Sequence, residues 1–399
     1  MTAERGAPAP RADKPAPLLS RSFLYICLAT SCFYLSFYLI LPVMPLYVAS
    51  LGGTSTQIGL IIGYFAAMAM LMRPPAGWLI DTRGHRPILL AGMAVFLLAS
   101  AGYVVTPSVS AILALRVFHG IGMGLFPTAA TVVVAELAPL HRRGEAMGWF
   151  GVANSVGLLV GPLAGPWIAA RFGFAALFLL AAAVAGAGMG CLLALPRPAP
   201  RPAPRVPRPG DFFSRAAVLP SGILLFLYVP YGAVVAFIPL IATARGLENP
   251  GIFYMVYAVA MLLVRAKAGE VSDGRGRAAV IIPGSIVAAA AMAVLGATSG
   301  SGGVLLAAAL LGAGVGAVLP AVMALTTDRA GLADRGKAMG TFYTAWEAGI
   351  ALGAAASGWL LTVTDFGTLF LGVAAMPLLG AALAVRARRG PAEAVGQSV

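Results

Sequence analysis

The chain has 399 residues, of which 60% are hydrophobic and only 10% are charged, and its mean hydropathy is +0.90. Soluble domains carry about 25% charged residues, so this composition excludes an ordinary soluble fold. Apolar stretches of about twenty residues cross a bilayer as helices, and the sequence therefore predicts an all-α polytopic membrane protein.

Runs without charged residues mark the predicted helices in chain order. Two of the runs are long enough for two spans each, and we divide them at the turn residues Gly52-Gly53 and at the stretch 298–303. A further helix is expected between Lys337 and Asp365. These divisions give twelve helices, drawn from runs at residues 22–72, 87–115, 117–135, 146–170, 172–196, 216–244, 249–264, 278–327 and 366–385.

The basic residues predict the orientation in the membrane. With the N-terminus inside, 22 Arg and Lys residues fall in inner segments and 2, Arg171 and Arg245, in outer loops. The positive-inside rule then places both ends in the cytoplasm and the chain in the cell inner membrane. The net charge of +13 is thus a topology signal that favours anionic lipid. It does not indicate a nucleic-acid partner, because the basic residues are scattered over short loops.

The cysteines and the N-terminal segment predict neither disulfide bonds nor a cleaved signal peptide. Cys27, Cys32 and Cys191 lie in apolar helices and indicate no disulfide framework. The first apolar run is too long for a cleavable signal and follows about twenty polar, Pro-rich residues. We expect no cleaved leader.

The chain aligns with itself when Arg73 is placed on Arg265, and we call this alignment the repeat register. It pairs "RPPAGWLIDTRGHR" with "RAKAGEVSDGRGRA", and "RGEAMG" from Arg143 with "RGKAMG" from Arg335, without a gap. The chain is predicted to consist of two homologous six-helix halves, an arrangement typical of parallel-repeat transporters. The predicted parts are a cytoplasmic tail 1–21, a first half 22–195, a Pro/Arg-rich linker 196–215, a second half 216–386 and a cytoplasmic tail 387–399. The linker favours extended polyproline II, and an SH3-type ligand is the alternative interpretation.

The stretch "GWLIDTRGHRP", residues 77–87, resembles the G-x-L-x-D-x-x-G-R-R motif of the major facilitator superfamily, with His85 where an Arg is usual. The resemblance implies the major facilitator fold, and a charge relay that holds the inner ends of the two halves together when the outside is open. Simple anchoring of a loop is the alternative. The implied relay residues are Asp81, Arg83, Arg86, Glu136, Arg143, Asp273, Asp328 and Arg335. The second copy departs from the motif at Gly274 and lacks its second Arg after Gly276.

The fourth predicted helix contains "RVFHGIGMGLFP", which resembles a family motif with His119 in place of Gln. An intramembrane arginine is costly and needs a partner or water, and Arg116 and His119 fall on one helical face. We therefore expect both to face the central cavity, in proton coupling or substrate binding. A histidine bound to a backbone carbonyl is the alternative for His119. Arg116 is expected to be the only arginine or lysine well inside the membrane.

The fifth predicted helix contains "GLLVGPLAG", residues 157–165, which resembles the G-x-x-x-G-P-x-x-G-G motif of drug:proton antiporters, with Pro166 in place of the last Gly. Glycines four residues apart allow close helix packing in lipid, and that packing alone is the alternative explanation. The helix-packing residues are Gly157, Gly161, Pro162 and Gly165.

Glu347 is the only acid predicted well inside a helix, and a carboxylate at that depth is expensive unless protonated, paired or hydrated. It points about 200° away from Gly349. If Gly349 and Gly353 pack against a neighbouring helix, Glu347 faces the cavity and is a candidate for proton coupling. A buried acid bonded to a hydroxyl is the alternative. Further candidates for lining the cavity are Tyr34, Tyr38, Asn154, Tyr228, Tyr231, Tyr343 and Trp346.

These features predict a proton-coupled exporter of a small amphiphilic or drug-like molecule that works by alternating access. The alternative is an uptake symporter for a small metabolite. A membrane-embedded transferase would need clustered catalytic acids, and the sequence contains no such cluster. A lipid or signalling scaffold would not need the intramembrane residues Arg116 and Glu347, so their presence argues against that class. No phosphate-binding loop is present in the sequence, so we expect no need for ATP. For a transporter of this kind we expect no enzymatic activity, cofactor or metal. The expected partners are the substrate, protons and membrane lipid, and the expected state is a monomer.

Overall fold

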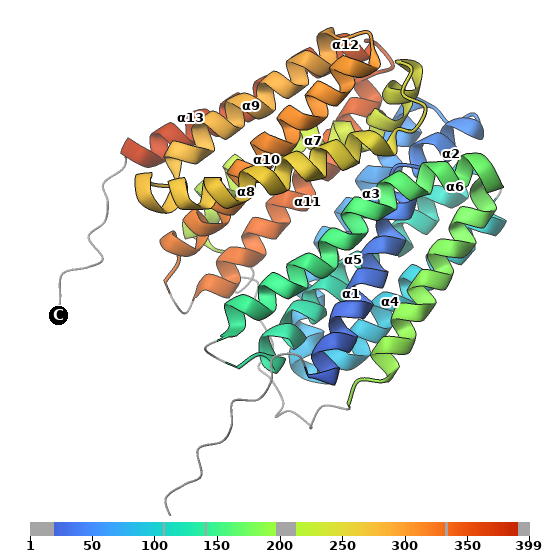
Figure 1. Ribbon diagram of the computed structural model, residues 1–399, viewed down its shortest axis with the longest axis vertical. Coiled ribbons are helices and arrows are strands. Elements are labelled where there is room, and N and C mark those ends of the chain that lie inside the picture. Colours follow the sequence, from blue (N-terminus) through green and yellow to red (C-terminus); the bar gives the residue numbers. More distant parts are fainter. Residues whose placement is uncertain (1–19, 107, 140–141, 197–212, 332–333, 390–399) are drawn as a thin grey trace, which may run out of the picture.

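The computed structural model describes residues 20–106, 108–139, 142–196, 213–331 and 334–389. Most of both predicted tails and most of the predicted linker lie outside the described residues. Within the described ranges every regular element is a helix (Figure 1). The α-helices are α1 (Arg21–Ile40), α2 (Met44–Ser50), α3 (Ser55–Arg83), α4 (His85–Gly102), α5 (Val109–Leu137), α6 (Arg143–Leu193), α7 (Val218–Ala244), α8 (Gly251–Arg275), α9 (Ala278–Ala297), α10 (Ser301–Arg329), α11 (Arg335–Leu360), α12 (Phe366–Val373) and α13 (Ala375–Arg389). Two short 3₁₀ turns, Tyr103–Val105 and Arg215–Ala217, complete them.

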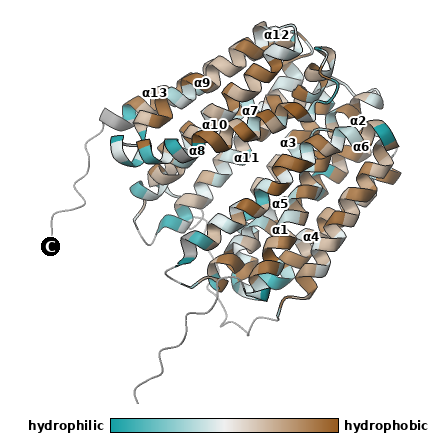
Figure 2. Cartoon of the chain, viewed as in Figure 1, coloured by the Kyte–Doolittle hydropathy of each residue, from teal (hydrophilic) through white to brown (hydrophobic). Residues whose placement is uncertain are grey.

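Ten of the described segments are long and apolar enough to cross a membrane. One of them, α6, reverses direction at Gly173, whose φ of 86° and ψ of 164° suit a residue without a Cβ. Helix α11 is not among the ten. Counting the two arms of α6 separately and adding α11 accounts for the twelve expected helices, although the crossing by α11 remains a prediction. Hydrophobic residues run along the helices, while the hydrophilic ones gather mostly near their ends (Figure 2).

Helices α1 to α6, here called the first half, pack internally in the same way as α7 to α13, the second half. Closely packed glycines on α5 leave no room for a Cβ against α3 and α4, and those on α10 leave none against α8 and α9. The contacts in the two halves correspond in the repeat register. The pairs are Gly120–Phe65 with Gly312–Tyr257, Gly122–Gly92 with Gly314–Gly284, and Gly124–Ala69 with Gly316–Met261.

The glycines of the fifth-helix motif pack against α1. Any Cβ on Gly157, Gly161 or Gly165 would collide with the α1 segment 34–39. Their counterparts Gly349 and Gly353 pack in the same way against α7, at residues 225–229. The close packing expected from the four-residue spacing is therefore present in both halves.

The ends of the helices define two sides of the molecule. One pocket is lined by residues from the starts of α1 and α4, the end of α5 and the segment after α6, among them Ser22, His85, Glu136 and Pro196. We call this the linker side, because the chain enters the linker there, and the opposite side the far side.

The two halves meet along two lines of contact, both tight towards the far side. In the first seam, between α3 and α11, a Cβ on Gly59 would collide with Ala354, and Thr56 Oγ1 donates to the Gly358 carbonyl at 3.4 Å. In the second seam, between α6 and α8, a Cβ on Gly251 would collide with Pro162. The two seams are themselves equivalent in the repeat register.

Pro166 explains the close approach at the second seam. A proline has no backbone N–H, so the carbonyl four residues earlier, that of Pro162, lacks its helical donor. Gly251 packs on that carbonyl, and the Asn249 side-chain amide donates to the next one, Leu163, at 3.0 Å.

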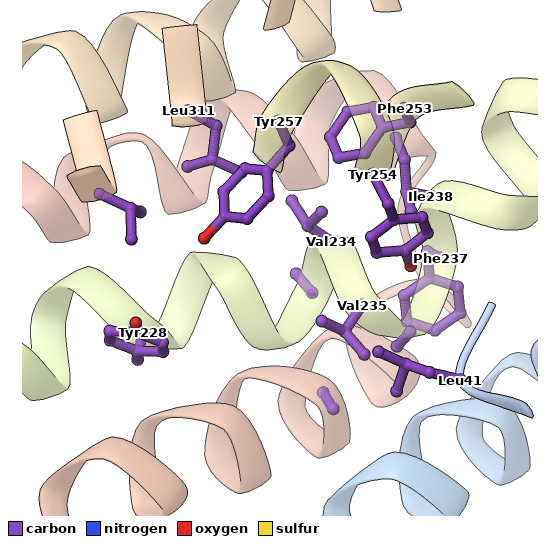
Figure 3. Packing of buried hydrophobic residues seen from close by; sticks show 14 of the residues in the cluster. Leu41, Tyr228, Val234, Val235, Phe237, Ile238, Phe253, Tyr254, Tyr257 and Leu311 are labelled. Carbon is purple, nitrogen blue, oxygen red and sulfur yellow. The ribbon is translucent and has the colours of Figure 1, made fainter. Parts of the chain in front are cut away.

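A continuous apolar core also crosses between the halves on the far side. Leu41, which follows α1, belongs to the same buried cluster as Val235 and Phe237 of α7, and Figure 3 shows these side chains facing one another. A separate buried cluster, containing Phe23, Ile80 and Leu192, fills the linker-side part of the first half alone. The described conformation is therefore closed on the far side.

Candidate functional site

One ion pair joins the two halves inside the bundle. Arg73 Nη2 of α3 donates to Glu347 Oε1 of α11 at 2.6 Å, and their side chains are 20% and 9% exposed. Arg73 stands ten residues before Arg83, where α3 ends, which corresponds to a depth of about 15 Å at 1.5 Å per residue. Glu347 points to α3 while Gly349 and Gly353 pack on α7, so its helical face turns towards the other half.

Tyrosine and tryptophan side chains surround this ion pair. The Arg73 guanidinium lies 5.1 Å from the centre of the Tyr343 ring, a cation–π contact. Tyr228 packs at 4.3 Å from Trp346 and 5.3 Å from Tyr231, measured between ring centres. On the first half, Tyr34 and Tyr38 stack at 6.2 Å.

These six residues, Tyr34, Tyr38, Tyr228, Tyr231, Tyr343 and Trp346, are here called the aromatic cluster. Its two parts meet at the core, because Tyr38 packs against the same buried cluster as Tyr231, Tyr343 and Trp346. Five of its members are partly exposed inside the bundle, and Tyr228 is buried. The structure thus brings all six predicted aromatic residues together with Glu347.

Asn154 lies on α6 with its Oδ1 buried and without a hydrogen-bond partner in the described part of the chain. The repeat register pairs it with Trp346, which belongs to the aromatic cluster. A buried amide oxygen without a donor is unusual and is suited to a ligand that carries a donor.

Arg116 and His119 are placed elsewhere. Arg116 is 1% exposed, its Nε donates to the Ile61 carbonyl at 3.0 Å, and its guanidinium lies over Phe65 at 4.2 Å. His119 is fully buried, and its Nδ1 lies 3.1 Å from the Tyr103 hydroxyl. All these neighbours belong to the first half, so the expectation that both residues face the space between the halves is wrong. The alternative for His119, a bond to a backbone carbonyl, is not seen either, because its Nδ1 contacts the Tyr103 hydroxyl.

The predicted relay of the first half lies on the linker side. Asp81 and Arg83 are exposed at the end of α3. His85 Nε2 lies 3.5 Å from Glu136 Oε2, and Arg86 Nη2 donates to the Leu193 carbonyl at 3.0 Å. The side chain of Arg143 lies outside the described residues. His85 thus contacts the acid of the relay from the position where the family usually has an arginine.

In the second half, Arg277 joins the two predicted acids. It pairs with Asp273, and its Nε donates to Asp328 Oδ2 at 2.9 Å. The hydrogen bond to Asp328 raises the pKa of the Arg277 guanidinium, and the hydrogen bond to Asp273 adds a smaller increase. Arg335 is exposed. The pair Arg277–Asp328 corresponds to His85–Glu136 in the repeat register, and the two halves therefore carry the same contact.

Three cationic side chains important for these contacts were not identified from the sequence. Arg73 opens the repeat that the sequence comparison found, and Arg277 is the counterpart of His85, so the repeat held a signal for both. Arg265, the counterpart of Arg73, is exposed and lies within electrostatic range of Tyr228 and Tyr343. The expectation that Arg116 is the only arginine well inside the bundle is therefore wrong.

Tyr257 also joins the aromatic cluster without having been predicted. Its ring centre lies 5.7 Å from that of Tyr231. Figure 3 shows its hydroxyl turned from α8 towards α7, the helix that carries Tyr228. Among the described residues, no group of three His, Cys, Asp or Glu side chains could hold a metal ion.

The family model of the Major Facilitator Superfamily matches residues 26–331 and 251–398. The chain belongs to this superfamily. The resemblance stated from the motif at residues 77–87 is thereby confirmed, and so is the fold class of a helical, polytopic membrane protein.

Two bacterial relatives are similar to part of the chain. Multidrug resistance protein 2 of Bacillus subtilis (strain 168) is 30% identical over 164 residues, which is 41% of this chain and 41% of the relative. Quinolone resistance protein NorA of Staphylococcus aureus (strain Mu50 / ATCC 700699) is 28% identical over 136 residues, 34% of this chain and 35% of the relative. The chain thus matches about two fifths or less of the length of these relatives.

Solved structures share the fold over nearly the whole chain. A POT family transporter in complex with a thioalcohol-conjugated peptide superimposes with a TM-score of 0.79 at 15% identity, covering 92% of this chain and 96% of the other. The nucleoside transporter NupG gives 0.75 at 13% identity, covering 92% and 99%. These similarities establish the fold of a multi-pass membrane transporter.

Proposed function

We propose that the protein is a proton-coupled exporter of small aromatic amphiphiles, and that the Arg73–Glu347 ion pair couples proton movement to the change between its two states. The observation that carries the proposal is that this pair connects the two halves beside the aromatic cluster. The partial similarity to drug-resistance proteins favours export. The role of the charge-relay residues and the cytoplasmic location of both ends remain part of this proposal.

The chemistry follows from the charges. When Glu347 is ionised, its attraction to Arg73 holds α3 against α11, and such a charge-assisted bond is strong in a site with little water. In the conformation that is open on the far side, a proton taken from that side would neutralise the carboxylate, so Glu347 would carry no charge during the change of state. In this scheme the described conformation, closed on the far side with the pair formed, follows release of that proton to the linker side and is the state that receives the substrate.

The uptake symporter remains the second candidate. A metabolite rich in phosphate or carboxylate groups would need several Arg or Lys side chains in the cavity, and the positions of Arg73 and Arg265 are consistent with that need. The aromatic cluster still favours a flat, apolar substrate over a small polar metabolite, because ring faces offer stacking contacts.

The test is proton-driven export by Glu347 variants. In inverted membrane vesicles with an imposed proton gradient, the wild-type protein should accumulate an aromatic dye, and a protonophore should abolish the accumulation. Glu347→Gln should lose at least tenfold in initial rate because an amide cannot carry the proton, while Glu347→Asp should retain part of it. Glu270→Gln, which neutralises an exposed acid of α8, is the control with unchanged rate.

Two results would contradict the proposal. Unchanged proton-driven export by Glu347→Gln would show that the coupling proton is carried elsewhere. Dye movement in the opposite sense, driven by protons moving with the dye, would establish the symporter instead.

A further inference from the structure

The two seams carry different charged residues at the same depth in the bundle. The close contacts Gly59–Ala354 and Gly251–Pro162 are equivalent in the repeat register, so each residue of the first seam has a counterpart in the second. Arg73 corresponds to Arg265, and each stands ten residues before the end of its helix. Glu347 corresponds to Ser155. The second seam therefore has the arginine without the acid.

Nothing in the described chain replaces the missing carboxylate. Arg265 is exposed and has no hydrogen bond or ion pair with any described residue. Ser155 bonds along its own helix, to the Gly151 carbonyl at 2.9 Å. Arg265 acts electrostatically on Tyr228 and on Tyr343, the ring that stacks with Arg73. Arg265 follows Tyr257 by eight positions on α8, about 12 Å along the helix, and the Tyr257 ring centre lies 5.7 Å from that of Tyr231 in the aromatic cluster.

The charge balance there is positive. Arg73 and Glu347 neutralise each other, and Arg265 adds a charge that has no counterion in the described residues. An unpaired arginine inside a membrane is costly, and its planar fork of N–H donors matches a carboxylate in two parallel hydrogen bonds. The buried Oδ1 of Asn154, next to Ser155, can accept from a donor group of the same ligand.

We propose that Arg265 binds the carboxylate of an aromatic amphiphilic substrate whose ring system lies on the aromatic cluster. The ligand carboxylate would occupy in the second seam the place that Glu347 holds in the first. This inference rests on the proposed function and specifies its substrate class.

Equilibrium binding to the full-length protein in lipid nanodiscs tests the assignment. The probes are 1-pyrenebutyrate and its neutral analogue 1-pyrenebutanol, measured by dialysis at neutral pH with empty nanodiscs as the partition control. The wild-type protein should bind the carboxylate more tightly than the alcohol. Arg265→Gln should weaken carboxylate binding at least tenfold and alcohol binding less than twofold, with Arg265→Lys in between.

Two further variants refine the test. Ser155→Glu copies the first seam into the second, so its new carboxylate should pair with Arg265 and compete with the carboxylate probe, again with alcohol binding kept. Lys267→Gln removes a positive charge from the same helix at an exposed position and should change neither affinity.

Several results would overturn the assignment. These are equal affinity of the wild-type protein for both probes, no binding of the carboxylate, unchanged carboxylate binding by Arg265→Gln, and an equal loss of both probes in a variant that elutes as a folded, monodisperse species. The assay needs no proton gradient, so failure of the coupling scheme at Glu347 would leave its outcome unaffected.

Discussion

At the scale of single residues, the ion pair between Arg73 and Glu347 is the contact with the largest expected effect. Removing one partner of a buried charge pair leaves the other uncompensated, which costs more than the pair itself contributes. Arg73 is 20% exposed, so water offsets part of this cost.

We therefore predict that Arg73→Gln lowers the free energy of unfolding by about 1–3 kcal/mol, the range for a buried polar group left without its partner. The double variant Arg73→Gln/Glu347→Gln should recover most of this loss, because two amides can bond to each other. Thermal unfolding in detergent micelles measures the single variants Arg73→Gln and Glu347→Gln and the double variant. If the double variant were as unstable as the sum of both single variants, the two residues would not be coupled.

Asp81 belongs to a different part of the mechanism. It is exposed on the linker side in a conformation closed on the far side, and the family motif implies that it acts in the opposite conformation. We predict that Asp81→Asn abolishes transport and leaves folding and ligand affinity unchanged, because the acid acts on the equilibrium between states and not at the site. Transport rates and equilibrium binding, measured on the same preparation, would refute this role if both were at the wild-type level.

At the scale of helices, the glycines of α6 set how closely it approaches α1. A Cβ on Gly161 would overlap Tyr38, whereas one on Gly151 of the same helix meets no other atom within 4 Å. The motif that resembles drug antiporters is therefore a packing surface in this protein, and it positions Tyr34 and Tyr38 of the aromatic cluster.

Gly161→Val should consequently destabilise the protein by about 1–3 kcal/mol, the usual cost of overpacking, while Gly151→Val should cost less than about 1 kcal/mol. The midpoint of thermal unfolding in detergent compares the two variants directly. Equal midpoints would mean that α6 and α1 separate easily and that the glycine spacing has no packing role.

At the scale of the whole molecule, the two halves touch at Gly59 and Gly251 on the far side, and larger side chains there cannot fit. Because the seams close only in this conformation, bulk at both positions should favour the conformation that is open on the far side. We predict that Gly59→Leu/Gly251→Leu shifts the population in that direction.

Spin labels at Ser108 and Ser299, in far-side loops of the two halves, measure this shift after the three native cysteines are replaced. The double variant should show a longer distance as its major population, whereas Gly190→Leu, at a position with open space, should keep the wild-type distribution. An unchanged distribution in the double variant would show that the seam does not control the closure.

The sequence by itself determined the helical membrane fold, the repeat, and the close packing of glycines four residues apart. These follow from local composition and from the repeat register, and neither depends on how the halves meet. It also identified Glu347 and the aromatic residues, because a lone acid or a tyrosine is conspicuous among apolar residues.

Only the tertiary structure decided which charges meet. Arg73 lies 274 positions from Glu347, and no periodicity relates α3 to α11. Arg116 carries the same signal of an arginine in an apolar helix, yet a carbonyl of the first half binds it. The difference lies in the direction each side chain takes from its helix, and the packing of the two halves fixes that direction.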